Sequence, residues 1–169
     1  VYEFNQQLNS ELNYRKLTQL VTHLTTNVLE SQSTWLLEYN NPSENHFKIV
    51  SHINLTQNQI MNHPFKALNG FNKYLVDGQK PVLINDLSQN RQLSQISQWK
   101  KDARAFIAAP LYSSRDQLLG IIYAAKTQPF GFDIDDLSLL ESFAKQAAIA
   151  LENNELIQSS FEKERLEQE

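Results

Sequence analysis

The residues of this sequence best suited to ligate a haem or a metal ion are four histidines: His23, His46, His52 and His63. His46 and His52 would share one face of an extended strand, but six residues of such a strand separate their rings by roughly 20 Å. No cysteine or glutamate stands at a spacing that would complete a metal site. We therefore expect the histidines at the surface or its boundary, and expect neither haem nor metal.

An acidic run, Asp133-Ile134-Asp135-Asp136, looks like the start of a calcium-binding loop. Leu137 takes the fifth position of such a loop, however, and the sixth residue is not glycine. The better interpretation is that Asp133 caps a helix and that Asp136 lies in its first turn. No serine–histidine–aspartate order, acid pair or phosphate-binding loop is recognisable, so the sequence predicts no catalytic site.

The chain contains no cysteine, which excludes disulfide bonds, thiolate metal sites and a cysteine nucleophile. Its net charge is -4 and its largest basic cluster is the pair Lys100-Lys101, so nucleic-acid binding is not expected. No apolar run approaches the roughly 20 residues of a membrane span, and no signal peptide opens the chain. These features predict a cytoplasmic location and no membrane span within this stretch of chain.

The composition predicts one globular domain, since 41% of the 169 residues are hydrophobic and 20% are charged. Apolar residues recur with a helical period over residues 1–29. Asn13 interrupts that period and could cap a second helix, so the pattern predicts a connector helix over residues 1–13 and then a helix of the domain.

A first hairpin is predicted next. Trp35, Leu37 and Tyr39 stand at alternate positions, which is typical of a half-buried strand over residues 33–39. Residues 40–43 have the composition of a turn. A second strand over residues 47–55 would have one inward side, formed by Phe47, Ile49, Ser51, Ile53 and Leu55.

The middle of the chain predicts a helix over residues 64–76 that ends at Asp77-Gly78, where glycine tolerates a left-handed cap. A short strand is predicted at residues 81–84 and a short helix at 93–101. Two apolar strands, over residues 106–112 and 118–125, are joined by a polar connection and predict a second hairpin.

A long helix is predicted to begin at Asp133, and its helical period continues past Asn154 into the charged C-terminal residues. Its buried stripe would consist of Leu137, Leu140, Ala144, Ala147, Ala148 and Leu151. Together the elements predict an α+β fold: a central antiparallel sheet of five to six strands, helices on its faces, and long N- and C-terminal helices.

Three motifs in this order resemble a GAF domain, a relative of PAS domains that senses small molecules. They are Ala105-Phe106-Ile107-Ala108-Ala109-Pro110-Leu111, Leu119-Gly120-Ile121-Ile122-Tyr123-Ala124 and Phe132-Asp133-Ile134-Asp135-Asp136-Leu137-Ser138-Leu139-Leu140. The resemblance implies a sensor domain over residues 14–154 and an exit helix over 155–169. Since residue 1 is not methionine and the sequence stops at residue 169 within a helical pattern, we expect a fragment of a longer protein.

The C-terminal residues 161–169 are similar to the linker that precedes the output domain of SpoIIE-like bacterial serine phosphatases. Linkers before histidine kinases and diguanylate cyclases look much the same. The resemblance therefore implies an attached output domain without deciding which one.

The resemblance also bears on cofactors. Members that bind cyclic nucleotides have a signature whose positions here are Ala125, Lys126, Phe132, Asp136 and Leu137. Only the lysine, phenylalanine and aspartate are retained, which predicts a structural Lys126–Asp136 ion pair and does not favour cyclic-nucleotide binding. Members with a covalent bilin need a cysteine, which is absent.

In this family a ligand cavity lies between the sheet and the helices and loops that join its middle strands. The positions that would line it are Phe71, Tyr74, Leu83, Trp99, Phe106, Ala108 and Tyr123. Such a lining would suit a small, flat, mostly apolar ligand. The alternative is that these side chains simply fill the core.

The resulting hypothesis is a sensory domain of a bacterial signal-transduction protein that binds a small molecule, forms a homodimer through its terminal helices, or does both. The alternative is a ligand-free dimerisation scaffold. Methionine sulfoxide reductases of the same fold need catalytic cysteines, so this enzyme activity is not expected.

Overall fold

A computed structural model describes the backbone of residues 2–40 and 45–168, and the side chains of residues 12–39 and 45–154. Most of the turn predicted at residues 40–43 lies outside these ranges. Within them, no helix is long and apolar enough to cross a membrane.

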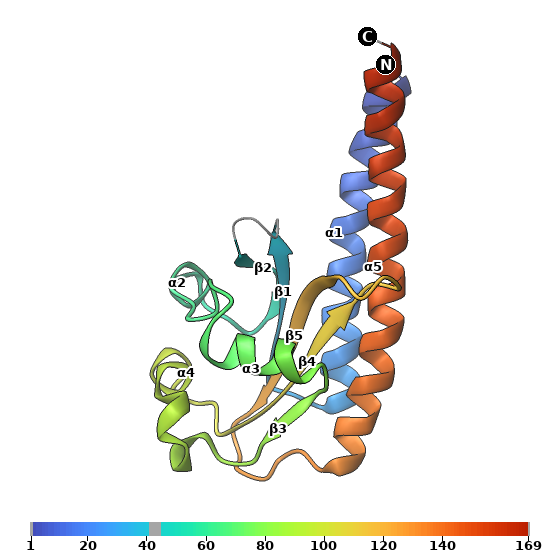
Figure 1. Ribbon diagram of the computed structural model, residues 1–169. Helices are drawn as coiled ribbons and strands as arrows, with labels where there is room; N and C mark the ends of the chain where they lie inside the picture. Colours follow the sequence, from blue (N-terminus) through green and yellow to red (C-terminus); the bar gives the residue numbers. More distant parts are fainter. Residues whose placement is uncertain (1, 41–44, 169) are drawn as a thin grey trace.

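One antiparallel sheet of five strands forms the centre of the molecule, with the order β2-β1-β5-β4-β3 (Figure 1). This sheet confirms the predicted fold class and both predicted hairpins. The strands are β1 (Ser33–Asn40), β2 (His46–Ile53), β3 (Val82–Ile84), β4 (Ala105–Tyr112) and β5 (Leu118–Lys126).

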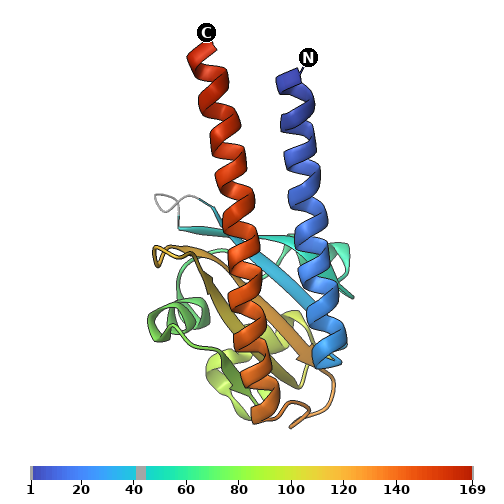
Figure 2. The same ribbon diagram turned by 90° about the vertical axis from the view of Figure 1, so that its right-hand side faces the viewer.

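Two long helices cover one face of the sheet. These are α1 (Tyr2–Leu29) and α5 (Ile134–Gln168), which lie side by side and extend together past the sheet (Figure 2). The opposite face is covered by α2 (Gln57–Met61), α3 (Gly70–Gly78), α4 (Ser94–Trp99) and the 3₁₀ turns η1 (Leu87–Gln89) and η2 (Arg91–Leu93) (Figure 1).

Because both faces are covered, the central strands are buried on both sides. Leu36 and Ile122 face α1 and α5, whereas Trp35 and Tyr123 face the short helices. The prediction of a half-buried strand over residues 33–39 is therefore wrong, since Leu36 is also only 2% exposed.

A β-bulge in β2 interrupts its pairing with β1, opposite Leu36 and Leu37. Leu36 pairs with Ser51 and Leu37 with Ile49, so β2 carries one extra residue there. Ser51 consequently lies opposite a residue that faces the long helices, and the single inward side predicted for residues 47–55 is wrong.

The helix predicted at residues 64–76 begins only at Gly70. The preceding residues bond to β2 instead: the Phe47 amide donates to the Lys66 carbonyl at 2.8 Å, and His46 forms an isolated bridge with Ala67. At the other end, Gln79 takes the left-handed conformation (φ 56°) that was expected of glycine.

One other helix prediction is wrong, and one helix was not predicted. α1 continues through Asn13 without a break, so no cap divides it there. α2 was not predicted; it starts with a capping box in which the Thr56 side chain accepts from the Gln59 amide and Gln59 reciprocates. By contrast, Asp133 caps α5 as predicted, since its Oδ1 accepts from the Asp136 amide at 2.9 Å.

His63 is buried, at 7% exposure, contrary to the expectation for the histidines; His23, His46 and His52 are exposed. Its Nδ1 accepts a hydrogen bond from the Phe65 amide at 3.2 Å. Burial, together with the positive charges of Lys66 and His46, lowers the pKa of His63 from 6.5 to about 4. Within the described chain, no group of three or more histidines and acids could hold a metal ion.

His63 is expected to make the folded state sensitive to acid. Between pH 6.5 and 4 the unfolded chain binds a proton at this histidine that the folded chain does not. The free energy of unfolding should therefore fall on acidification over that range, by up to about 3 kcal/mol at roughly 1.4 kcal/mol per pH unit. Urea unfolding at several pH values measures the slope.

The His63→Asn variant serves as the comparison, because an amide oxygen can still accept the Phe65 amide and does not titrate. We expect a flatter pH dependence in this variant. Equal slopes for wild type and variant would mean that the loss of stability has another source.

Candidate functional site

Six aromatic rings fill the centre of the sheet face that lies opposite the long helices. The Trp35 and Tyr123 rings are stacked with centroids 5.3 Å apart, and Trp99 meets Trp35 edge-on at 5.1 Å. Contacts of this kind connect the whole aromatic cluster, which we define as Trp35, Phe65, Phe71, Trp99, Phe106 and Tyr123.

A buried polar contact lies beside this aromatic cluster. The Tyr123 hydroxyl donates to Asn72 Oδ1 at 2.7 Å, while Asn72 Nδ2 donates to the carbonyls of Phe65 (2.9 Å) and Ala67 (3.2 Å). Burial raises the pKa of Tyr123 well above its usual value, so the phenol stays neutral and remains a donor. The contact joins β5, α3 and the segment before α3.

The structure divides the seven predicted lining residues into two groups. Phe106, Ala108 and Tyr123 are fully buried in the core. Trp99 packs against Trp35 and Phe65 of the same core, and its indole Nε1 donates to the Gln59 carbonyl at 2.7 Å. The other three line a pocket of about 550 Å³ between α3, β3 and η2, which we call the α3–β3 pocket. Its lining is Gly70, Phe71, Tyr74, Val82, Leu83, Ile84, Asn90, Gln92 and Leu93.

The chemistry of the α3–β3 pocket is mixed. Phe71, Tyr74 and Leu83 supply apolar surface, whereas Asn90 and Gln92 add amide groups at one side. Sequence reasoning missed both amides, because residues in a polar loop have no periodicity that would assign them to a cavity. The lining therefore offers both apolar surface and hydrogen-bonding groups.

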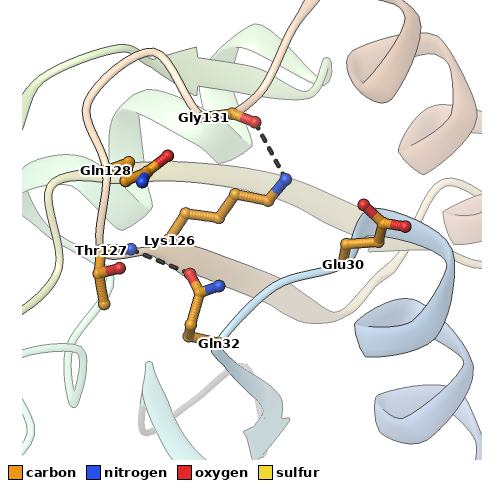
Figure 3. Close-up of a pocket in the computed structure, with 6 residues that line it drawn as sticks. All are labelled: Glu30, Gln32, Lys126, Thr127, Gln128 and Gly131. Carbon is orange, nitrogen blue, oxygen red and sulfur yellow. Dashed lines mark hydrogen bonds between the residues drawn. The ribbon is translucent and has the colours of Figure 1, made fainter.

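A second, polar pocket of about 350 Å³ lies where the end of α1 meets the loop between β5 and α5 (Figure 3). We call it the α1–α5 junction pocket. Sequence reasoning missed it, since its residues are far apart in the chain. It is lined by Glu30, Gln32, Lys126, Thr127, Gln128 and Gly131.

Lys126 is the central cation of the junction pocket. Its Nζ donates to the Gly131 carbonyl at 3.0 Å and lies 4.8 Å from the centre of the Phe132 ring. None of the ion pairs between described residues joins Lys126 to Asp136, so the predicted pair is wrong. Asp136 instead accepts the Asp133 amide at 2.9 Å, completing the reciprocal cap of α5.

The long helices expose apolar side chains on the side away from the sheet. In α1, Leu20, Leu24 and Val28 recur every four residues and are 53%, 40% and 42% exposed. In α5, Leu139 and Ile149 are similarly exposed. In α1 these side chains form an apolar row that the domain itself leaves uncovered, whereas α5 adds two separate exposed apolar side chains.

Comparison with known proteins places the fold. The sequence matches the GAF domain family over residues 11–152. No match was found among curated proteins.

Solved structures with a similar fold include the PixJ GAF domain of Thermosynechococcus elongatus in its blue-light-absorbing form (TM-score 0.72, 11% identity, 92% of this chain and 95% of that chain). Another is the GAF domain of an Acinetobacter phosphoenolpyruvate-protein phosphotransferase (TM-score 0.68, 10% identity, 94% of this chain and 98% of that chain). A third is a GAF domain/HD domain protein of Geobacter sulfurreducens (TM-score 0.69, 11% identity, 85% of this chain and 94% of that chain). At such identities the likeness concerns the fold alone.

Proposed function

Because this chain belongs to the GAF domain family, we propose that it is a sensory and regulatory domain that forms a homodimer through α1 and α5. The proposal assigns no catalytic role to the domain itself. Its output would be an attached domain such as a serine phosphatase, a histidine kinase or a diguanylate cyclase.

The observation that carries the proposal is the apolar outer face of α1. Leu20, Leu24 and Val28 are separated by one helical turn each and form a continuous row. Complete burial of an exposed leucine or valine side chain contributes about 1.5–3 kcal/mol, so covering each of these half-exposed side chains would contribute roughly half of that. A second copy would cover the row on both molecules at once, because a two-fold axis brings the same surface of each copy together.

α5 supports transmission from the domain. It is a single helix whose N-terminal half packs on the sheet and whose C-terminal part extends beyond it (Figure 2). The β4–β5 turn holds it near the point of departure, since the Ser114 amide and hydroxyl donate to the Glu152 carboxylate at 3.0 and 2.7 Å. These hydrogen bonds lower the pKa of Glu152, so the carboxylate stays ionised as an acceptor.

The Leu20→Glu/Leu24→Glu variant is expected to dissociate the dimer, because association would bury four like charges in an apolar interface. The dimer dissociation constant should rise by at least about 100-fold, the equivalent of roughly 3 kcal/mol. Analytical ultracentrifugation over a concentration series measures it.

Met61→Glu is the control, since it replaces an exposed apolar residue by glutamate in α2, on the other face of the sheet. This variant should dimerise like the wild type. A wild-type chain that stays monomeric at hundreds of micromolar, or a double variant that stays dimeric, would contradict the proposal.

Small-molecule sensing is the second candidate function, favoured by the α3–β3 pocket. Its rim residue Tyr74 is exposed, so Tyr74→Ala should remove lining without unfolding the domain. A flat heteroaromatic ligand, cyclic nucleotides included, should raise the melting temperature of the wild type and raise it less in Tyr74→Ala. If no compound raises the melting temperature of the wild type, the alternative function of a ligand-free dimerisation scaffold is favoured.

A further inference from the structure

The α1–α5 junction pocket offers hydrogen-bond donors on one side. The Lys126 ammonium has three donors, of which the Gly131 carbonyl accepts one. Gln32 uses its Oε1 to accept the Thr127 amide at 3.0 Å, which leaves its NH₂ group to donate elsewhere. Both groups border the same space (Figure 3), so this side of the pocket is suited to a carboxylate.

The facing side of the junction pocket is acidic. Glu30 follows the last residue of α1 in a left-handed conformation (φ 53°), and its carboxylate lies across the pocket from Lys126 (Figure 3). The C-terminal end of α1 adds the negative end of a helix dipole at this place. This side is suited to an ammonium group.

The two charges leave room for a guest between them. None of the ion pairs within the described residues involves Lys126 or Glu30. The pocket volume of about 350 Å³ lies at the lower end of the range for small-molecule sites. Since one carboxylate balances one ammonium, a guest with both charges would be matched better than a simple anion or cation.

We propose that the junction pocket binds a small zwitterion of the α-amino acid class. The ligand carboxylate accepts from Lys126 and Gln32, and the ligand ammonium donates to Glu30. The ligand thereby connects the end of α1 to the loop that leads into α5. Binding at this site does not depend on the dimer proposed above, and each can fail without the other.

Isothermal titration calorimetry with the common free α-amino acids, their N-acetyl derivatives and their carboxamides tests the assignment. We expect at least one free amino acid to bind, and to bind about tenfold or more tightly than either blocked form, because each block removes one charged contact. If no free amino acid binds at concentrations up to about 10 mM, the dissociation constant is too high for specific recognition and the proposal fails.

Glu30→Gln supplies the decisive variant, since Glu30 is exposed and its loss should not affect folding. Affinity for the free amino acid should fall about tenfold, whereas affinity for the N-acetyl derivative should stay unchanged. Glu141→Gln, an exposed glutamate of α5 outside the pocket lining, is the control and should leave both affinities unchanged. Equal affinities in wild type and Glu30→Gln would overturn the assignment.

Lys126→Met tests the other end of the ligand. It should weaken binding of the free amino acid and abolish the preference for the acid over the carboxamide. Circular dichroism establishes first that the variant is folded, because Lys126 also supports the Gly131 loop. If Lys126→Met does not fold, the Glu30→Gln result alone decides.

Discussion

Replacement of Gly120 by alanine is expected to destabilise the domain by about 3 kcal/mol, the upper end of the usual overpacking penalty. Gly120 lies in β5 and pairs with Glu38 of β1, one residue past Leu37. An added Cβ would stand 2.1 Å from the Leu37 carbonyl oxygen and 3.2 Å from the Leu37 carbonyl carbon. The obstacle is main chain in the middle of the sheet, so relief requires the two central strands to separate. Denaturant unfolding measures the loss.

Gly78→Ala is the matched control. Gly78 ends α3, does not have a positive φ, and has no neighbouring atom within 4 Å of the place that an alanine Cβ would take. Alanine there should be neutral or should stabilise by up to about 1 kcal/mol, because it restricts the unfolded chain. Similar unfolding midpoints for Gly120→Ala and Gly78→Ala would show that β1 and β5 do not approach each other this closely.

Removal of the Asn72 side chain is the second large effect. Asn72→Ala should lower the free energy of unfolding by about 3 kcal/mol, since it leaves a buried hydroxyl and two carbonyls without their partner. Tyr123→Phe removes only one of these contacts and should cost about 1–2 kcal/mol. Denaturant unfolding of both variants gives the values.

The double variant isolates the contribution of the Tyr123–Asn72 hydrogen bond from the other effects of the two substitutions. If Tyr123 and Asn72 interact as described, the Asn72→Ala/Tyr123→Phe loss should be smaller than the sum of the single losses by about 1 kcal/mol. Asn153→Ala, at an exposed position of α5, is the control and should change stability by less than about 0.5 kcal/mol. Strictly additive losses would contradict the Tyr123–Asn72 contact.

The second hairpin and α5 could be predicted from the sequence because their signals are local. β4 and β5 are long apolar runs, and Asp133 stands where a helix cap is needed. The region before α3 could not be predicted in this way. Its residues have a helical period, yet the backbone at Lys66 pairs with β2, and that contact is set by the fold and not by neighbouring residues.

The candidate site was less predictable than the fold. Phe71 and Phe106 are both aromatic and the family resemblance points to both, but only Phe71 reaches a pocket while Phe106 is enclosed by the core. Residue type does not distinguish these two environments. The junction pocket joins residues about 100 positions apart, such as Glu30 and Lys126, so no spacing in the sequence could have indicated it.

The anchoring of α5 at Glu152 gives the helix the geometry of a lever. The β4–β5 turn holds it there through Ser114, and the helix continues without a break to Gln168. At 1.5 Å per residue the part of α5 beyond Glu152 is about 24 Å long, so a tilt of only about 5° at the anchor would displace its end by roughly 2 Å. A change too small to disturb the sheet would thereby become a movement large enough to alter helix packing at the far end.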